Sequence, residues 1–119
     1  MTGNRDDSES AIAREHLLTA AFDAHIDRIE AHRITMQPAQ TAFRHAHPGG
    51  VVGYVVEGDI TFEIAGRPAT TLRRGDVFYE PPGATINRFD NASDSAATFV
   101  AFYPLTGDQA LISPVDQSS

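Results

Sequence analysis

Short apolar segments that alternate with turn sequences constrain the fold of this 119-residue chain more than any other feature. Glycine, proline and aspartate mark the turns, as in Glu57-Gly58-Asp59 and Pro81-Pro82-Gly83. Segments this short and this evenly spaced are typical of an all-β barrel or jelly roll. Their β-branched and aromatic residues predict strands at about 51–57, 60–65, 69–72, 76–80, 85–89 and 97–103.

The part of the chain that precedes these segments predicts one more strand and an arm. Residues 26–37, which end at Pro38, favour a strand. The segment 11–22 suits either a short helix or an extended arm, and its pattern leaves both open. The predicted organisation begins with a disordered N-terminus (1–10) and an N-terminal arm (11–32). A barrel domain (33–112) and a loose polar tail (113–119) follow.

Composition excludes several classes of partner. The net charge is −7, and the nine basic residues are all arginine, so neither nucleic acid nor an anionic membrane is an expected partner. The absence of cysteine excludes disulfides, and no apolar run is long enough to span a bilayer.

The first ten residues are acidic and polar, unlike a secretory signal, so we expect a cytoplasmic location. The lysine-free, alanine-rich usage suggests a bacterial source.

Two histidines stand one residue apart just before the strongest predicted strand. On an extended segment, His45 and His47 point their imidazoles to the same side. The β-branched and aromatic run 51–57 follows them, so the pair is expected at the mouth of a strand. This arrangement predicts half of a metal site.

The stretch from Phe43 to Gly50 resembles the first motif of the cupin superfamily, and the stretch from Gly75 to Gly83 resembles the start of the second. The resemblance covers roughly residues 33–103 and implies a cupin-type antiparallel β-barrel or jelly roll with an N-terminal arm or short helix. Cupin motifs usually add a glutamate and a third histidine to the histidine pair, and these four residues hold one divalent metal. This chain has Val51 and Ile86 at those two positions.

The resemblance therefore implies either a metal-poor cupin or one with substitute ligands. Valine and isoleucine cannot coordinate a metal, and two imidazoles fall short of the three protein ligands of typical catalytic sites. The expected cofactor is none, or one weakly held divalent ion of iron, manganese, zinc or nickel. The expected metal ligands are the histidine pair with a substitute carboxylate or a group from a partner chain: His45 and His47, with Glu80 or Asp90.

Side-chain alternation predicts which residues line the barrel. If Ile86 faces inward, then Arg88 and Asp90 share its face, whereas Asn87 and Phe89 face the other way. Arg88 could then hold an anionic oxygen, or it could be a solvated residue paired with Asp90.

Glu80 is open to two interpretations as well. It is a ligand or general base if it faces the pocket, and an ordinary exposed carboxylate otherwise. The expected catalytic residues are His45, His47 and Arg88. The expected substrate-binding residues are mainly apolar: Val51, Tyr54, Phe62, Phe78, Glu80, Ile86, Phe99 and Phe102.

Three functions are compatible with these residues. The first is a small-molecule enzyme of the isomerase, lyase or cyclase type, in which a histidine acts as acid or base. The resemblance to metal-free cupins such as sugar epimerases supports it. The second is a metal enzyme of the dioxygenase or hydroxynitrile-lyase kind that uses a substitute ligand. The third is a non-catalytic small-molecule-binding protein. A homodimer is expected in each case, because sheet edges and the N-terminal arm are available for pairing.

Overall fold

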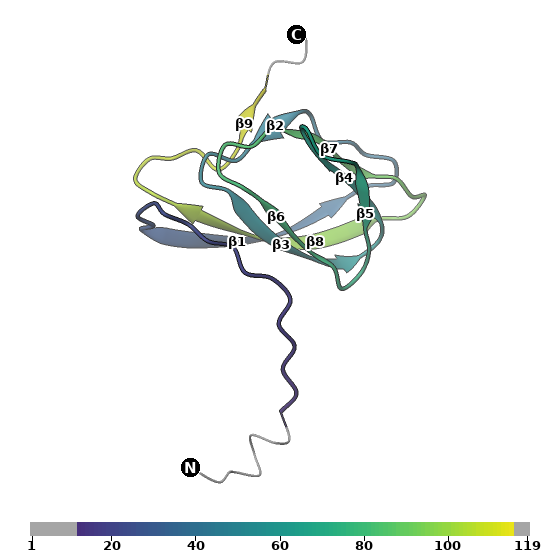
Figure 1. Cartoon of the computed structure of the whole chain (residues 1–119). Helices are drawn as coiled ribbons and strands as arrows, with labels where there is room; N and C mark the ends of the chain where they lie inside the picture. The colour runs from purple at the N-terminus through teal and green to yellow at the C-terminus, as the bar shows by residue number, and fades with distance from the viewer. Residues whose placement is uncertain (1–11, 116–119) are drawn as a thin grey trace.

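The computed structural model describes residues 12–115, which form two antiparallel sheets that face each other (Figure 1). The described part of the chain contains no helix, which confirms the all-β class, and its two antiparallel sheets are compatible with the predicted jelly roll. It therefore offers no helix able to cross a membrane. The strands are β1 (Arg28–Met36), β2 (His45–Ala46), β3 (Val51–Glu57), β4 (Ile60–Ile64), β5 (Thr70–Leu72), β6 (Val77–Glu80), β7 (Ile86–Asn91), β8 (Ala97–Leu105) and β9 (Ser113–Pro114).

The first sheet has the order β1-β8-β3-β6. Its central strand β8 alternates from Ala97 to Tyr103: Phe99, Ala101 and Tyr103 are buried, whereas Phe102 is exposed. Alternation of this kind fits a sheet with one face on the core and the other face turned outward. The inner face of β8 therefore forms one wall of the barrel.

The second sheet has the order β5-β4-β7-β2-β9, and a β-bulge in it changes the face of one predicted site residue. On β4, Glu63 pairs with Arg88 and the next residue pairs with Ile86, so Asn87 is an extra residue on β7. The bulge reverses the alternation that the sequence predicted. Phe89 is consequently buried, and the side chain of Arg88 is 50% exposed and lies 3.4 Å from Asp90. The prediction that Arg88 faces the interior is wrong.

A group of four phenylalanines fills the space between the sheets. The rings of Phe62, Phe78, Phe89 and Phe99 pack in tilted or edge-to-face pairs with centroids 4.9–5.9 Å apart. Gly53 on β3 makes room for one of them, because a Cβ at this position would lie 2.0 Å from the Phe78 ring. The aromatic core therefore depends on a residue without a side chain.

The ends of the described chain differ from the predicted boundaries. Residues 12–27 contain neither helix nor regular strand, so the helical form of the arm is not found there. β1 begins at Arg28, inside the segment predicted as arm, and β9 lies in the segment predicted as a loose tail. The predicted disordered N-terminus and the last four residues lie outside the described residues.

Candidate metal centre

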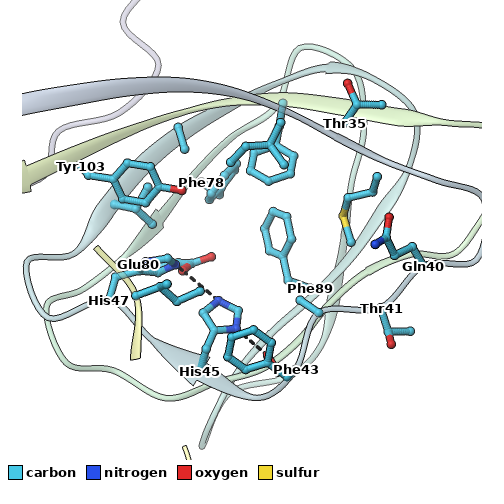
Figure 2. Close-up of a pocket in the computed structure, with 17 residues that line it drawn as sticks. Thr35, Gln40, Thr41, Phe43, His45, His47, Phe78, Glu80, Phe89 and Tyr103 are labelled. Atoms are coloured by element: carbon cyan, nitrogen blue, oxygen red, sulfur yellow. Dashed lines mark hydrogen bonds and ion pairs between the residues drawn. The ribbon is translucent and has the colours of Figure 1, made fainter. Parts of the chain in front are cut away.

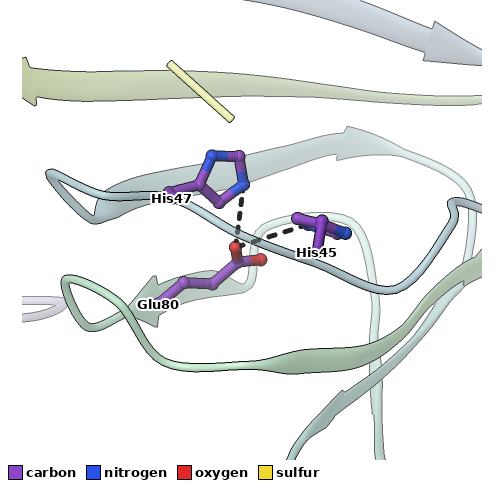
Figure 3. Close-up of side chains that lie close together, drawn as sticks. All are labelled: His45, His47 and Glu80. Carbon is purple, nitrogen blue, oxygen red and sulfur yellow. Dashed lines mark ion pairs between the residues drawn. The ribbon is translucent and has the colours of Figure 1, made fainter. Parts of the chain in front are cut away.

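Three ionisable side chains meet at one end of the barrel (Figure 3). His45 lies on β2, His47 follows that strand, and Glu80 ends β6. They are 4%, 6% and 2% exposed. Their potential ligand atoms all lie within 4.8 Å of one another. Of the two interpretations of Glu80, the one in which it faces the pocket agrees with the structure.

The local backbone places these groups by turns that the sequence encodes. The amide of Gly50 donates to the carbonyl of His47 at 2.9 Å, which closes a turn over Pro48 and Gly49. Gly50 has φ +83°, and a Cβ there would lie 3.1 Å from the carbonyl oxygen of Glu80. The close approach of the histidine turn to the end of β6 thus requires glycine.

Both imidazoles are held by backbone carbonyls. Nδ1 of His45 donates to Phe43 O at 2.7 Å, and Nδ1 of His47 donates to Leu111 O at 2.8 Å. A carbonyl oxygen only accepts, so each Nδ1 carries a proton and each neutral ring presents an Nε2 lone pair. Such a bond to the far ring nitrogen is the usual way in which a metal-binding histidine is oriented.

One oxygen of the Glu80 carboxylate, Oε1, lacks a hydrogen-bond donor among the described residues. It lies 3.1 Å from Nε2 of His47 and 3.9 Å from Nε2 of His45. Nevertheless, no hydrogen bond of acceptable geometry from the described residues reaches this buried oxygen. A buried carboxylate without a donor is costly. A cation, either a metal ion or a proton on an imidazole, would remove that cost.

The surroundings shift the pKa values of the two histidines in opposite directions. Burial lowers the pKa of His45 and outweighs the opposing effects of the Phe43 carbonyl and of Glu80. Burial also acts to lower the pKa of His47, but contact with Glu80, its charge and the Leu111 carbonyl together raise that pKa. In the absence of metal, His47 is therefore the imidazole of the two that more readily binds a proton.

The donor set fits a divalent transition metal. Two imidazole nitrogens and one carboxylate oxygen form the set found in non-haem iron sites, and His₂Glu is also a catalytic zinc set. The unsatisfied Oε1 of Glu80 and the two Nε2 lone pairs are the groups that such an ion requires. Asp90, the other substitute ligand considered, lies beside Arg88 and is not part of this cluster.

The cluster opens into a cavity of about 320 Å³ between the two sheets (Figure 2). Its walls include Phe78, Phe89 and Phe99, and the ring of Tyr103 lies 5.4 Å from that of His47. The remaining lining residues come from β1, β3 and β8 and from the segments after β1 and β8. The lining residues that the sequence did not predict are Ile34, Thr35, Met36, Gln40, Thr41, Ala42, Phe43, Phe89, Ala101 and Ile112.

Some predicted substrate-binding residues line this cavity and others do not. Val51, Phe78, Glu80 and Phe99 line it, as do both histidines. Tyr54 and Phe102 are 41% and 42% exposed, because alternation on β3 and β8 turns them to the outer face of the first sheet. Three further predicted residues also lie outside the lining: Phe62 packs behind Phe78 and Phe89, Ile86 is buried on β7 opposite His45 of β2, and Arg88 is on the outer face of β7.

The missed lining residues carried one usable signal. Ile34 and Met36 share a face of β1, and the alternation of that strand was visible in the sequence. The loop residues Gln40 and Thr41 gave no signal, because their place depends on how the segment after β1 crosses the barrel mouth.

Solved structures similar to this chain include three enzymes. The DMSP lyase DddQ from Ruegeria pomeroyi matches with a TM-score of 0.66 and 18% identity, over 76% of this chain and 45% of that one. The polyketide cyclase RemF from Streptomyces resistomycificus matches with a TM-score of 0.64 and 20% identity, over 77% and 63%. An oxalate oxidase in complex with glycolate matches with a TM-score of 0.63 and 22% identity, over 73% and 46%.

These likenesses concern the fold, since the identities are low. The chain spans less than two thirds of each of these three proteins. A comparison with functionally curated proteins found no match. A family model described as the cupin domain matches residues 32–103, which is more than half of the chain, and the protein therefore belongs to the cupin family.

Proposed function

We propose that this protein is a metal-dependent cupin enzyme that acts on a small molecule in the barrel cavity. The observation that carries the proposal is the convergence of two Nε2 lone pairs and an unsatisfied carboxylate oxygen at the buried end of that cavity. His45, His47 and Glu80 would hold the ion. When bound, a divalent ion supplies Lewis-acid or redox chemistry to a substrate oxygen.

The residues of the chain set the conditions for that chemistry. The carbonyls of Phe43 and Leu111 fix the two imidazole rings, so little reorganisation is needed when a cation binds. The phenylalanine walls give the cavity an apolar lining, and an apolar environment strengthens electrostatic interactions at the reacting end. The cavity therefore combines a polar reaction centre with apolar walls, the usual form of a small-molecule site.

Tyr103 is the polar group best placed to assist the reaction. Its ring lies beside His47, and its hydroxyl points into the cavity in Figure 2. Burial, with a smaller effect from the charge of Glu80, raises the pKa of Tyr103 to about 12. The hydroxyl thus stays protonated at neutral pH and can donate a hydrogen bond to a substrate oxygen.

The test is the metal content of protein purified without a histidine tag, measured by plasma mass spectrometry, followed by titration with iron, manganese, zinc and nickel. We expect near-stoichiometric uptake of at least one of these ions. His45→Ala and Glu80→Gln should abolish it, whereas His16→Ala, a control at an exposed histidine outside the cavity, should not. Uptake that survives Glu80→Gln would contradict the proposed ligand set.

The contact between His47 and Glu80 supports a second candidate function. In this alternative the protein is a metal-free isomerase, lyase or cyclase, and the pair holds a proton between Nε2 and Oε1, which are 3.1 Å apart. A protein that takes up none of the four ions, yet loses turnover with His47→Gln, would favour this candidate.

A further inference from the structure

The described arginines near the cavity all point away from it. Arg33, Arg44 and Arg88 each adjoin a lining residue in sequence, namely Ile34, Phe43 and Phe89. None of the three lines the cavity, and Arg33 and Arg88 are exposed. Within residues 12–115, the cavity lining contains no arginine or lysine.

The partners of these arginines account for their positions. Arg44 donates from Nε to the side-chain oxygen of Asn87, the bulged residue of β7, at 2.9 Å. Arg88 pairs with Asp90 on the outer face of the same strand. Without the bulge, alternation would turn Arg88 into the cavity and Phe89 to the outer face. The bulge thus removes positive charge from the cavity and inserts a phenyl ring instead.

The end of the cavity opposite the metal centre is polar but uncharged. In Figure 2 Gln40 and Thr41 lie across the cavity from Glu80 and His47. The side-chain oxygen of Gln40 accepts a hydrogen bond from the backbone N–H of Gln37 at 2.8 Å. This bond orients the Gln40 amide and leaves its NH₂ group as a donor for a ligand.

We propose that the cavity selects an uncharged, largely aromatic molecule with an oxygen donor at the end next to His45, His47 and Glu80 and a hydrogen-bonding group at the end next to Gln40. The volume of about 320 Å³ suits a ligand of roughly two fused rings. A second anionic group on the ligand would find no cation at the Gln40 end, because the described lining contains no arginine or lysine. This inference rests on the proposed function, because it names the substrate class of the same site.

The test is calorimetric titration of the protein, at its measured metal content, with two probes that share one ring system. 2,6-Dihydroxynaphthalene is uncharged at neutral pH, whereas naphthalene-2,6-dicarboxylate carries a charge at each end. We expect the diol to bind at least about tenfold more tightly, since one end of the dicarboxylate must lie without a counter-charge. Equal or tighter binding of the dicarboxylate, or no binding of the diol, would overturn the inference.

Two variants test whether the preference for the diol arises at the Gln40 end of the cavity. Gln40→Arg places a cation at the uncharged end and should reduce the preference for the diol at least about tenfold. Thr71→Arg adds the same charge at an exposed position of β5 outside the lining and should leave the preference unchanged. If both variants change the preference equally, general charge attraction explains it and the inference fails.

Metal content is measured separately in the same samples, so the two proposals fail independently. A protein without metal uptake that still prefers the diol would refute the proposed metal function and retain the ligand class. A protein that binds metal but prefers the dicarboxylate would support the proposed metal function and refute the ligand class.

Discussion

Glu80 lies directly opposite Val51 in the antiparallel pair of β3 and β6. Opposed residues in such a pair point to the same face, with Cβ atoms about 5 Å apart. Val51 occupies the position at which cupin motifs usually carry the glutamate ligand. The carboxylate of this site therefore comes from the neighbouring strand, one cross-strand step away from its usual origin.

This relationship predicts that a glutamate at position 51 can replace Glu80 as the metal ligand. We expect Glu80→Val to abolish metal uptake and the double variant Val51→Glu with Glu80→Val to restore it to within about tenfold of the wild-type affinity, because a glutamate on either strand can reach the same cavity end. Calorimetric titration with zinc and with manganese measures both affinities. A folded double variant, judged by its thermal midpoint, that takes up neither ion would show that only β6 can supply the carboxylate.

The fold was largely predictable because its signals are local. Turns such as Glu57-Gly58-Asp59 and the β-branched strand before it are visible in short windows, and the predicted strands agree with the observed bounds to within two residues. The histidine pair was equally visible, since its two members are separated by one residue on extended chain.

The parts that the sequence did not reveal depend on register between strands. The bulge at Asn87 arises from the pairing of β7 with β4, and no pattern within β7 announces it. As a result Arg88 was predicted on the wrong face. The orientation of Glu80 was left open for the same reason, because it depends on the pairing of β6 with β3.

The packing of Phe78 over Gly53 predicts the effect of a single methyl group. In Gly53→Ala the added Cβ would lie 2.0 Å from the ring, so Phe78 must shift toward the cavity. We expect a loss of about 1–3 kcal/mol in the free energy of unfolding, measured with denaturant, and weaker binding of the naphthalene diol. Phe78→Leu in the same background should recover part of the stability. A Gly53→Ala protein with unchanged stability and binding would contradict this packing argument.

The environment of Tyr103 predicts a change of stability in the alkaline range. Its folded-state pKa of about 12 lies above the ordinary value of 10.0, so the buried phenol favours the protonated folded state. This contribution is complete below pH 10.0 and is lost as the pH rises toward 12. Unfolding free energies measured along this range in metal-free protein should fall more steeply for the wild type than for Tyr103→Phe. Parallel curves for the two proteins would show that Tyr103 ionises as an exposed tyrosine does.

The outer face of the first sheet predicts a homodimer. Ile29, Tyr54 and Phe102 expose 64%, 41% and 42% of their surfaces on strands of this sheet. The arm over residues 12–27 extends away from the barrel in Figure 1 and exposes Ile12 and Leu17. Phe22 of the same arm already packs edge-on against Tyr79 of β6, with ring centroids 5.8 Å apart. This face therefore accepts apolar side chains of the arm.

A second copy of this chain is the occupant that we expect, because its own arm and sheet face carry the complementary apolar groups. Light scattering coupled to gel filtration should give the mass of a dimer for the wild type. Phe102→Glu should shift the protein toward the monomer, since it buries a charge in the contact, whereas Thr71→Glu at an exposed position of the second sheet should not. Deletion of the arm should weaken the dimer as well. A wild-type protein that stays monomeric at high concentration would contradict the predicted homodimer. Phe102→Glu and Thr71→Glu would then give the same monomer mass.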